Sequence, residues 1–310
     1  MKYLFIALAA LLFSVMEILG KLAVGLNALQ LNFLRFVLGG IILLLPTINI
    51  LKRENIKLTK NDIIYFFGTG LLGVVISMSL FQLAINFTKA STVAILFSTN
   101  PIFTILFACL FLGEKLNKKT IVSIIFSSLG ILFILNPFRT NSDILGIVLS
   151  ILSAVTFSLY SIAGKLRSSK YGSTVLNCMS FIIGSAIMLI LIFISNFPVI
   201  SSHISPTGKL GFMINIPILS GINLQNIIPL ILLGVLVTGF GYMFYFKAMD
   251  TTSVTTASMV FFIKPALAPI FALLILNESI SINTIIGIAL ILIGAYFIFV
   301  KKNLKIKLKS

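Results

Sequence analysis

Residues 84–101, AINFTKASTVAILFSTNP, return in altered form at residues 248–265 as AMDTTSVTTASMVFFIKP. These two stretches belong to a longer alignment without gaps between residues 63–136 and residues 227–300. About 20 of its 74 positions are identical. Self-similarity of this extent indicates that the chain contains an internal duplication.

The duplication also reaches the beginning of each copy. Phe13-Ser14 and Gly20-Lys21-Leu22 return 144 residues later as Phe157-Ser158 and Gly164-Lys165-Leu166. We therefore expect a first unit at 3–136, a second unit at 144–300, and a short basic tail at 301–310.

The composition predicts a membrane protein. Of the 310 residues, 59 % are hydrophobic and only 10 % are charged, whereas a soluble domain has about 25 % charged residues. Apolar runs near 20 residues recur, and such a run can cross a bilayer core of about 30 Å as a helix. Because lipid offers the backbone no hydrogen bonds, and strand alternation is absent, we expect an all-α integral membrane protein.

Ten transmembrane helices are expected, five in each copy. Since five is odd, the second copy must enter the membrane with the opposite orientation, so the two units form inverted repeats. The expected spans are 3–23, 29–51, 63–86, 90–112, 119–136, 144–165, 173–196, 226–248, 253–276 and 281–300.

The basic residues predict the orientation of these spans. With both termini in the cytoplasm, 17 Lys and Arg residues fall on the cytoplasmic side and 3 fall outside (Lys89, Arg139 and Lys209). This bias is typical of a multi-pass protein of the plasma membrane. It also explains the net charge of +16 as topogenic, so no nucleic-acid partner is expected; we expect the tail to contact anionic membrane lipid.

Several short motifs, taken in order, resemble a known family. The first copy has Arg35-Phe36, then A-x-N-F-T-K-A-S-T-V-A from Ala84, then Pro101, Leu112-Gly-Glu-Lys-Leu116 and Gly130. The second copy matches at Ala248, Ser253–Ser258, Pro265, Asn277-Glu278 and Gly294. Over essentially its whole length, the chain resembles the EamA repeat of the drug/metabolite transporter superfamily.

This resemblance implies a ten-helix carrier with a central cavity between the repeats, which moves a small polar metabolite by alternating access. It does not identify the substrate, the direction of transport or the coupling ion. The second copy has Asn277 where the pattern has Gly, and Ser180 where the first copy has Arg35. Whether both copies contribute equally to the site therefore stays open.

Lys264 is the strongest candidate for a functional residue. It lies in the middle of span 253–276, where a charge costs at least about 2.5 kcal/mol to insert. Its counterpart in the first copy is Asn100, which precedes Pro101 at the same depth, and we expect the two residues to mark the substrate site where the repeats meet. We expect Lys264 to bind an anionic group of the substrate or to carry a coupling proton; the alternative is a structural lysine paired with helix carbonyls. Pro101, Pro265 and Pro269 are expected to kink their helices.

A second candidate group is Glu17 with Arg35 and Lys21. Glu17 and Arg35 are each about six residues below the outer surface, roughly 9 Å deep at 1.5 Å per residue, and Lys21 is one helical turn from Glu17. We expect an ion-paired cluster that either holds the first two helices together or acts as an outer gate or proton site.

Neutral polar residues and the remaining acids complete the prediction. Gln82, Tyr242 and Tyr245 are expected to line the cavity, with a position in the interfacial aromatic belt as the alternative. Glu114 and Glu278 are expected to have structural roles at helix ends. Four acids are expected to be solvated loop residues: Glu54, Asp62, Asp143 and Asp250.

No motif for an enzyme, a metal site or a cofactor is present. The chain lacks a phosphate-binding loop, a dinucleotide motif and a nucleophile elbow. The two cysteines and one histidine do not form a ligand cluster. We therefore expect a secondary transporter of an amino acid or organic anion rather than an enzyme; a channel, a scaffold or a lipid-modifying membrane enzyme are the alternatives.

Overall fold

A computed structural model describes residues 2–88, 90–115, 118–135, 144–198, 211–276 and 281–299. Within these residues every regular element is a helix. Eight helical stretches are long and apolar enough to cross a membrane, each with a mean hydropathy of 2.0 to 2.5. The expectation of an all-α membrane protein is therefore confirmed.

Helices occupy all ten of the expected ranges, several of them in pieces. In chain order they are α1 (Lys2–Ser14), α2 (Met16–Leu22), α3 (Ala28–Arg53), α4 (Lys60–Gly70), η1 (Leu71–Ser77), α5 (Met78–Phe87), α6 (Ala90–Phe97), α7 (Asn100–Leu112), α8 (Lys118–Leu135), α9 (Ile144–Leu166), α10 (Ser168–Ser195), the short η2 (Gly211–Met213), α12 (Ile227–Leu232), η3 (Leu233–Gly241), α13 (Tyr242–Thr251), α14 (Val254–Ser258), α15 (Val260–Leu276) and α16 (Ile282–Phe299).

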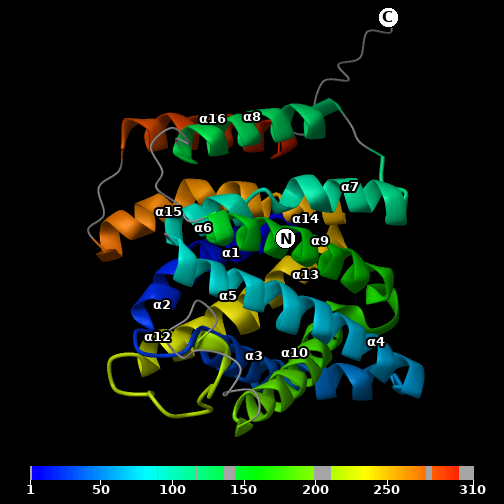
Figure 1. Ribbon diagram of the computed structural model, residues 1–310. Helices are drawn as coiled ribbons and strands as arrows, with labels where there is room; N and C mark the ends of the chain where they lie inside the picture. Colours follow the sequence, from blue (N-terminus) through cyan, green and yellow to red (C-terminus); the bar gives the residue numbers. More distant parts are fainter. Residues whose placement is uncertain are drawn as a thin grey trace, which may run out of the picture.

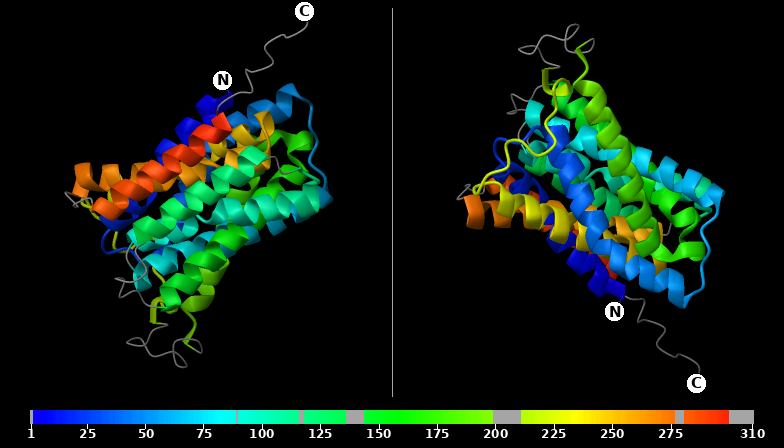
Figure 2. Two further views of the ribbon diagram at one scale, coloured as in Figure 1. Left: turned by 90° about the horizontal axis from the view of Figure 1, so that it is seen from above. Right: turned by 90° about the horizontal axis from the view of Figure 1, so that it is seen from below.

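Helices α8 and α16 are the counterparts that close the two copies. They pack side by side along one face of the bundle (Figures 1 and 2). A Cβ added to Gly130 would lie 2.6 Å from the Gly287 carbonyl oxygen, and one added to Gly294 would lie 2.7 Å from the Ser127 hydroxyl. These glycines therefore allow the helices to approach closely. Neither helix is among the eight long spans, so the count of ten transmembrane helices stays a prediction.

The pieces of the broken helices follow the duplication. The π-helical segments η1 and η3 lie inside the third and eighth expected spans, and a shift of 164 residues places 71–77 on 235–241, within η3. The fourth span is interrupted at Ser98-Thr99 and the ninth at Met259. Segments of π-helix and breaks in membrane helices are frequent at functional sites.

Contacts between the copies also come in matched sets. Helix α1 packs against α15, η3 and α13, while its counterpart α9 packs against α6, α7, η1 and α5. Helix α3 packs against η3 in the same way as its counterpart α10 packs against η1. This exchange pattern is expected of two units related by a pseudo-twofold axis; the inversion of one unit stays a prediction.

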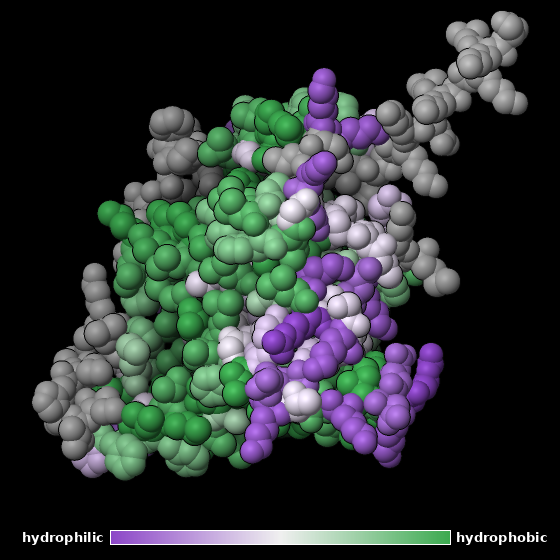
Figure 3. Space-filling model, turned by 90° about the vertical axis from the view of Figure 1, so that its right-hand side faces the viewer, coloured by the Kyte–Doolittle hydropathy of each residue, from purple (hydrophilic) through white to green (hydrophobic). Residues whose placement is uncertain are grey.

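One end of the bundle is hydrophilic. Hydrophilic residues gather on the face in Figure 3 that corresponds to the right-hand end of Figure 1, where α3 ends and α4 begins. Exposed Lys52, Arg53, Lys57 and Lys60 belong to this end. Much of the remaining surface in this view is apolar, as contact with lipid requires.

Candidate functional site

Two buried charged residues, Lys264 and Glu17, form an ion pair within spans whose helices are interrupted. Lys264 on α15 is completely buried, and its ammonium forms an ion pair with Oε1 of Glu17. Glu17 is in the first turn of α2, directly after the interruption of the first span at Val15. The Lys264 Nζ also lies 5.5 Å from the ring centroids of Phe81 and Phe97. The ion pair therefore links the first copy to the second inside an apolar and aromatic shell.

Arg35 on α3 is also completely buried, but it has no such partner. None of its three guanidinium nitrogens has a hydrogen-bond acceptor among the described residues. Glu17 acts on its charge electrostatically, and the Tyr242 hydroxyl lies beside the guanidinium as its nearest polar neighbour without meeting the full distance and angle of a hydrogen bond. The guanidinium carbon lies 4.9 Å from the centroid of the Phe36 ring.

The structure corrects the expected ion-paired cluster. Glu17 pairs with Lys264 rather than with Arg35, and Lys21 is exposed and lies outside the buried group. The sequence predicted the same depth for Glu17 and Arg35, but equal depth does not specify which side chains face each other. Packing of the first span against α15 brings the lysine to the glutamate.

The side-chain oxygen and nitrogen of Asn100, the counterpart of Lys264, both have hydrogen-bond partners. Its Nδ2 donates to the Ala154 carbonyl at 2.9 Å and to the Ser158 hydroxyl at 2.7 Å, both on α9. Its Oδ1 accepts from the Thr104 hydroxyl at 3.1 Å. Asn100 is completely buried and contacts no charged group in these hydrogen bonds, so it joins α7 to α9.

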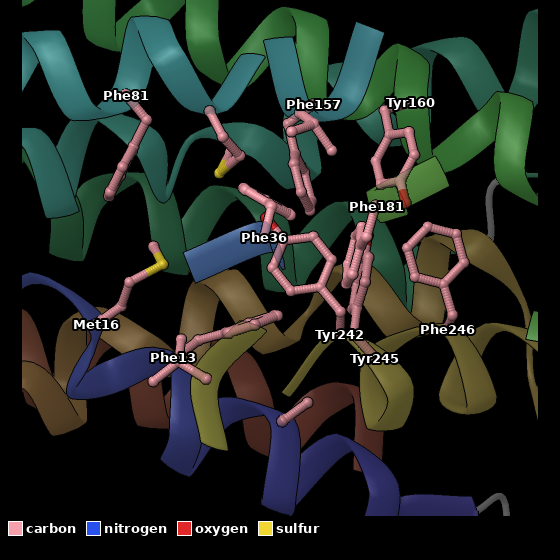
Figure 4. Packing of buried hydrophobic residues seen from close by; sticks show 14 of the residues in the cluster. Phe13, Met16, Phe36, Phe81, Phe157, Tyr160, Phe181, Tyr242, Tyr245 and Phe246 are labelled. Atoms are coloured by element: carbon pink, nitrogen blue, oxygen red, sulfur yellow. The ribbon is translucent and has the colours of Figure 1, made fainter. Parts of the chain in front are cut away.

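The other predicted cavity residues are buried around an aromatic core (Figure 4). Tyr242 and Tyr245 begin α13, directly after η3, and both are at most 2 % exposed. Tyr242 makes edge contacts with the rings of Phe13 and Phe36, and the Tyr245 hydroxyl lies 3.1 Å from the Ser161 hydroxyl. Neither tyrosine is in an interfacial belt.

Gln82 is buried on α5, and the three predicted kink prolines lie on α7 and α15. Gln82 on α5 is 4 % exposed, and its Nε2 is 3.9 Å from a Cβ built on Gly20 of α2. Pro101 does not bend a continuous helix, because it occupies the first turn of α7 after the interruption. Pro265 and Pro269 lie inside α15. The interruption of that span, at Met259, precedes both prolines.

Sequence reasoning missed one charged residue. Asp62 was expected to be solvated, but it is completely buried at the basic end of the bundle. It accepts hydrogen bonds from the Thr59 backbone at 2.8 Å, from Lys170 at 2.6 Å and from the Tyr171 hydroxyl, and Arg167 lies 3.6 Å away. The Thr59-x-x-Asp62 capping box was the available signal. Asp62 thereby ties α4 to α10.

The sequence predicted the structural role of Glu114 at a helix end, but not its hydrogen-bond partners. Glu114 does act at a helix end, but its two carboxylate oxygens accept from the backbone N–H groups of Val254 and Thr255 at 3.0 and 3.3 Å. It therefore caps α14, which belongs to the other copy. Glu278 and Asp143 lie outside the described residues.

The charge balance of the site determines what it can bind. Near the aromatic core the buried charged side chains are Glu17, Arg35 and Lys264, so the group carries one uncompensated positive charge. Oε2 of Glu17 also has no hydrogen-bond partner among the described residues. Across those residues no group of three His, Cys, Asp or Glu side chains could hold a metal ion.

Comparison with known proteins connects this arrangement to a family. The model of the EamA-like transporter family matches residues 1–136 and 144–300. An uncharacterized transporter of Clostridium kluyveri is 42 % identical over 302 residues, which cover 94 % of this chain and 91 % of the relative. A pseudopaline exporter of Pseudomonas aeruginosa is 29 % identical over 165 residues, which cover 53 % of this chain and 56 % of the exporter.

A solved crystal structure has the same fold, with a TM-score of 0.72 at 17 % sequence identity, and the match covers 96 % of this chain and 95 % of the other. The resemblance noted in the sequence is confirmed by the family match. Together with the apolar helices, it establishes a multi-pass membrane protein of a transporter family. The chain belongs to the EamA-like transporter family.

Proposed function

We propose that this protein is a secondary transporter that moves a small polar metabolite with an acidic group, an amino acid or an organic anion, across the plasma membrane. The observation that carries this proposal is the buried set of Glu17, Lys264 and Arg35 with one positive charge in excess. Buried ionisable groups of this kind are costly in a membrane protein and mark transport pathways.

Alternating access is supported by the architecture. The charged group lies between elements of both copies, beside the interruptions and the π-helical segments. Hydrogen bonds hold both ends of the bundle: Lys170 to Asp62 at the basic end, and the Asn27 and Asn226 side chains to the Phe212 and Val24 carbonyls at the other. Opening one end at a time would expose the site to one side of the membrane.

The proposed orientation has both termini in the cytoplasm. The split of 17 basic residues to 3 supports it, since cytoplasmic loops are rich in Lys and Arg. The polar face at the α3–α4 connection (Figure 3) would then be the inner surface. Attaching a reporter to this loop and to residue 310, and measuring its accessibility from outside intact cells, tests the orientation. Labelling of either site from outside would contradict it.

The competing classes lack support among the residues described. A membrane enzyme would need reactive acids, histidines or serines grouped near one interface, and a channel would need a symmetric oligomeric pore. A relative is named a pseudopaline exporter, which favours transport of a small metabolite.

The Glu17–Lys264 pair is the proposed place for exchange of a coupling proton, because two titratable groups meet there.

The test is a transport screen with matched variants. Proteoliposomes containing the wild-type protein are loaded with a metabolite mixture, and uptake and release are measured with and without a pH gradient. Lys264→Met should abolish transport of the identified metabolite, whereas Lys60→Met, which removes an exposed lysine at the basic end, should not. A folded Lys264→Met protein with wild-type transport would refute the role of the pair.

A further inference from the structure

The guanidinium of Arg35 is a buried cation near the aromatic core with no carboxylate or carbonyl acceptor among the described residues and only the Tyr242 hydroxyl beside it. All three of its nitrogens are solvent-inaccessible and unpaired. An arginine cannot escape this cost by losing its proton. Burial without acceptors is therefore unfavourable in the ligand-free protein, and a ligand that supplies the acceptors would remove the penalty.

The surroundings hold Arg35 between the two copies. One turn earlier on α3, Asn32 donates to the Val74 carbonyl of η1 at 3.0 Å and to the Ser79 hydroxyl at 3.1 Å. On the other side, α3 packs against η3, and Tyr242 at the end of η3 acts on the Arg35 charge. The helix face that carries Arg35 is therefore tied to η1 through Asn32, and Tyr242, directly after η3, lies beside Arg35.

Lys264 is a weaker candidate for receiving the substrate's acidic group. Its ammonium already has Glu17 as counter-ion and two aromatic rings beside it. An incoming anion at Lys264 would have to share the cation with a buried carboxylate and would meet its repulsion. At Arg35 the same anion meets three nitrogens without a hydrogen-bond partner, and Glu17 acts on this cation only electrostatically, without the direct ion pair that it makes with Lys264.

We propose that Arg35, rather than Lys264, binds the substrate, and that it binds a carboxylate. This inference rests on the proposed transport function. The planar guanidinium fork matches a carboxylate with two parallel hydrogen bonds. One carboxylate also neutralises the single excess positive charge of Glu17, Lys264 and Arg35, whereas a phosphate dianion would leave a negative charge buried. The site therefore selects small carboxylates.

The test crosses a change in the protein with a change in the ligand. Transport and thermal stabilisation are measured in proteoliposomes and in detergent for the carboxylate found in the metabolite screen and for its primary amide. Arg35→Gln removes the guanidinium, and Arg35→Lys keeps the charge but not the fork. Arg53→Gln removes an exposed arginine from the end of the same helix and serves as the matched control.

Wild type and Arg53→Gln should prefer the carboxylate over the amide by about 10- to 100-fold, the range for hydrogen bonds to charged groups. Arg35→Gln should abolish this preference, and Arg35→Lys should keep only part of it. If the preference survives in Arg35→Gln, the carboxylate binds elsewhere and the inference is wrong although transport is real. If wild type transports a metabolite with no carboxylate, or a phosphate monoester instead, the inference also fails while the proposed function stands.

Should Arg35→Gln not fold, the ratio of carboxylate to amide in Arg35→Lys decides the question: a ratio equal to that of wild type overturns the assignment. Absence of transport of every metabolite by the wild-type protein would instead count against the proposed function itself, before any variant is compared.

Discussion

Two contacts in matching places of the duplicated chain have opposite chemistry. In one, Asn100 on α7 meets Ser158 on α9 through neutral hydrogen bonds. In the other, Lys264, the counterpart of Asn100, meets Glu17, one turn beyond Ser14, which is the counterpart of Ser158. The neutral contact uses every donor and acceptor of its amide, while the charged one leaves Oε2 of Glu17 unpaired. The two contacts therefore differ in kind, although each joins one copy to the other: the neutral contact is fully paired, and the charged one is not.

A similar division occurs at the two ends of the bundle. Asp62, one residue before the aligned stretch, ties α4 to α10 through charged partners. Its counterpart, Asn226, directly precedes α12 and makes neutral hydrogen bonds to the Val24 and Gly221 carbonyls, at 2.9 Å each. In these two pairs of buried positions, Asn100 with Lys264 and Asp62 with Asn226, the charge appears in one copy only, which limits the number of buried ions that the fold must stabilise.

The largest expected effect comes from breaking the charged contact. Glu17→Gln leaves Lys264 buried without its counter-ion and should lower the free energy of unfolding by about 3–5 kcal/mol. Glu17→Gln combined with Lys264→Met should recover most of this loss, because no isolated charge remains. Thermal unfolding in detergent measures both. A double variant as unstable as Glu17→Gln alone would show that the two residues do not depend on each other.

A smaller effect is expected where the copies are chemically equal. Gly130→Ala and Gly294→Ala each force a Cβ against the partner helix between α8 and α16, and overpacking typically costs about 1–3 kcal/mol. The two variants should lose similar stability. Gly68→Ala on α4 is the control, since a Cβ there meets nothing within 4 Å. Equal stability of Gly68→Ala and Gly130→Ala would mean that α8 and α16 do not approach as closely as described.

The neutral contact should affect stability without affecting the substrate. Asn100→Ala removes the hydrogen bonds to the Ala154 carbonyl and the Ser158 hydroxyl. The free energy of unfolding should therefore fall by about 1–2 kcal/mol. The KM for the transported metabolite should stay within about twofold of wild type, measured in proteoliposomes beside the unfolding curve. A KM increase of tenfold with normal stability would place Asn100 in the binding site and remove the contrast between the copies.

The smallest effect is expected from Tyr245→Phe. The variant keeps the ring contacts and loses only the hydrogen bond with Ser161, so stability should fall by about 0.5–1.5 kcal/mol. Ser161→Ala should give a similar loss, and the double variant should add little to either. Additive losses in the unfolding curves would indicate that the two hydroxyls act independently.

Much of the architecture followed from the sequence because the bilayer restricts what apolar segments can do. Long apolar runs had to become helices, and all ten expected ranges are helical. The repeat also related Lys264 to Asn100, and both residues are buried. Interruptions within these helices were less predictable: Pro101 and Pro265 are in equivalent positions, but the breaks at Ser98-Thr99 and at Met259 are not at the prolines themselves.

The sequence alone determined that this chain is a duplicated, all-helical membrane protein with a few charges at depth, because hydropathy and self-similarity are properties of the linear chain. Only the tertiary structure decided that Glu17 pairs with Lys264, that Arg35 is left without an acceptor, and that Asp62 is buried. The reason is geometric. Spacing along a helix gives the depth of a residue, but the neighbour it meets at that depth depends on how separate helices rotate and pack.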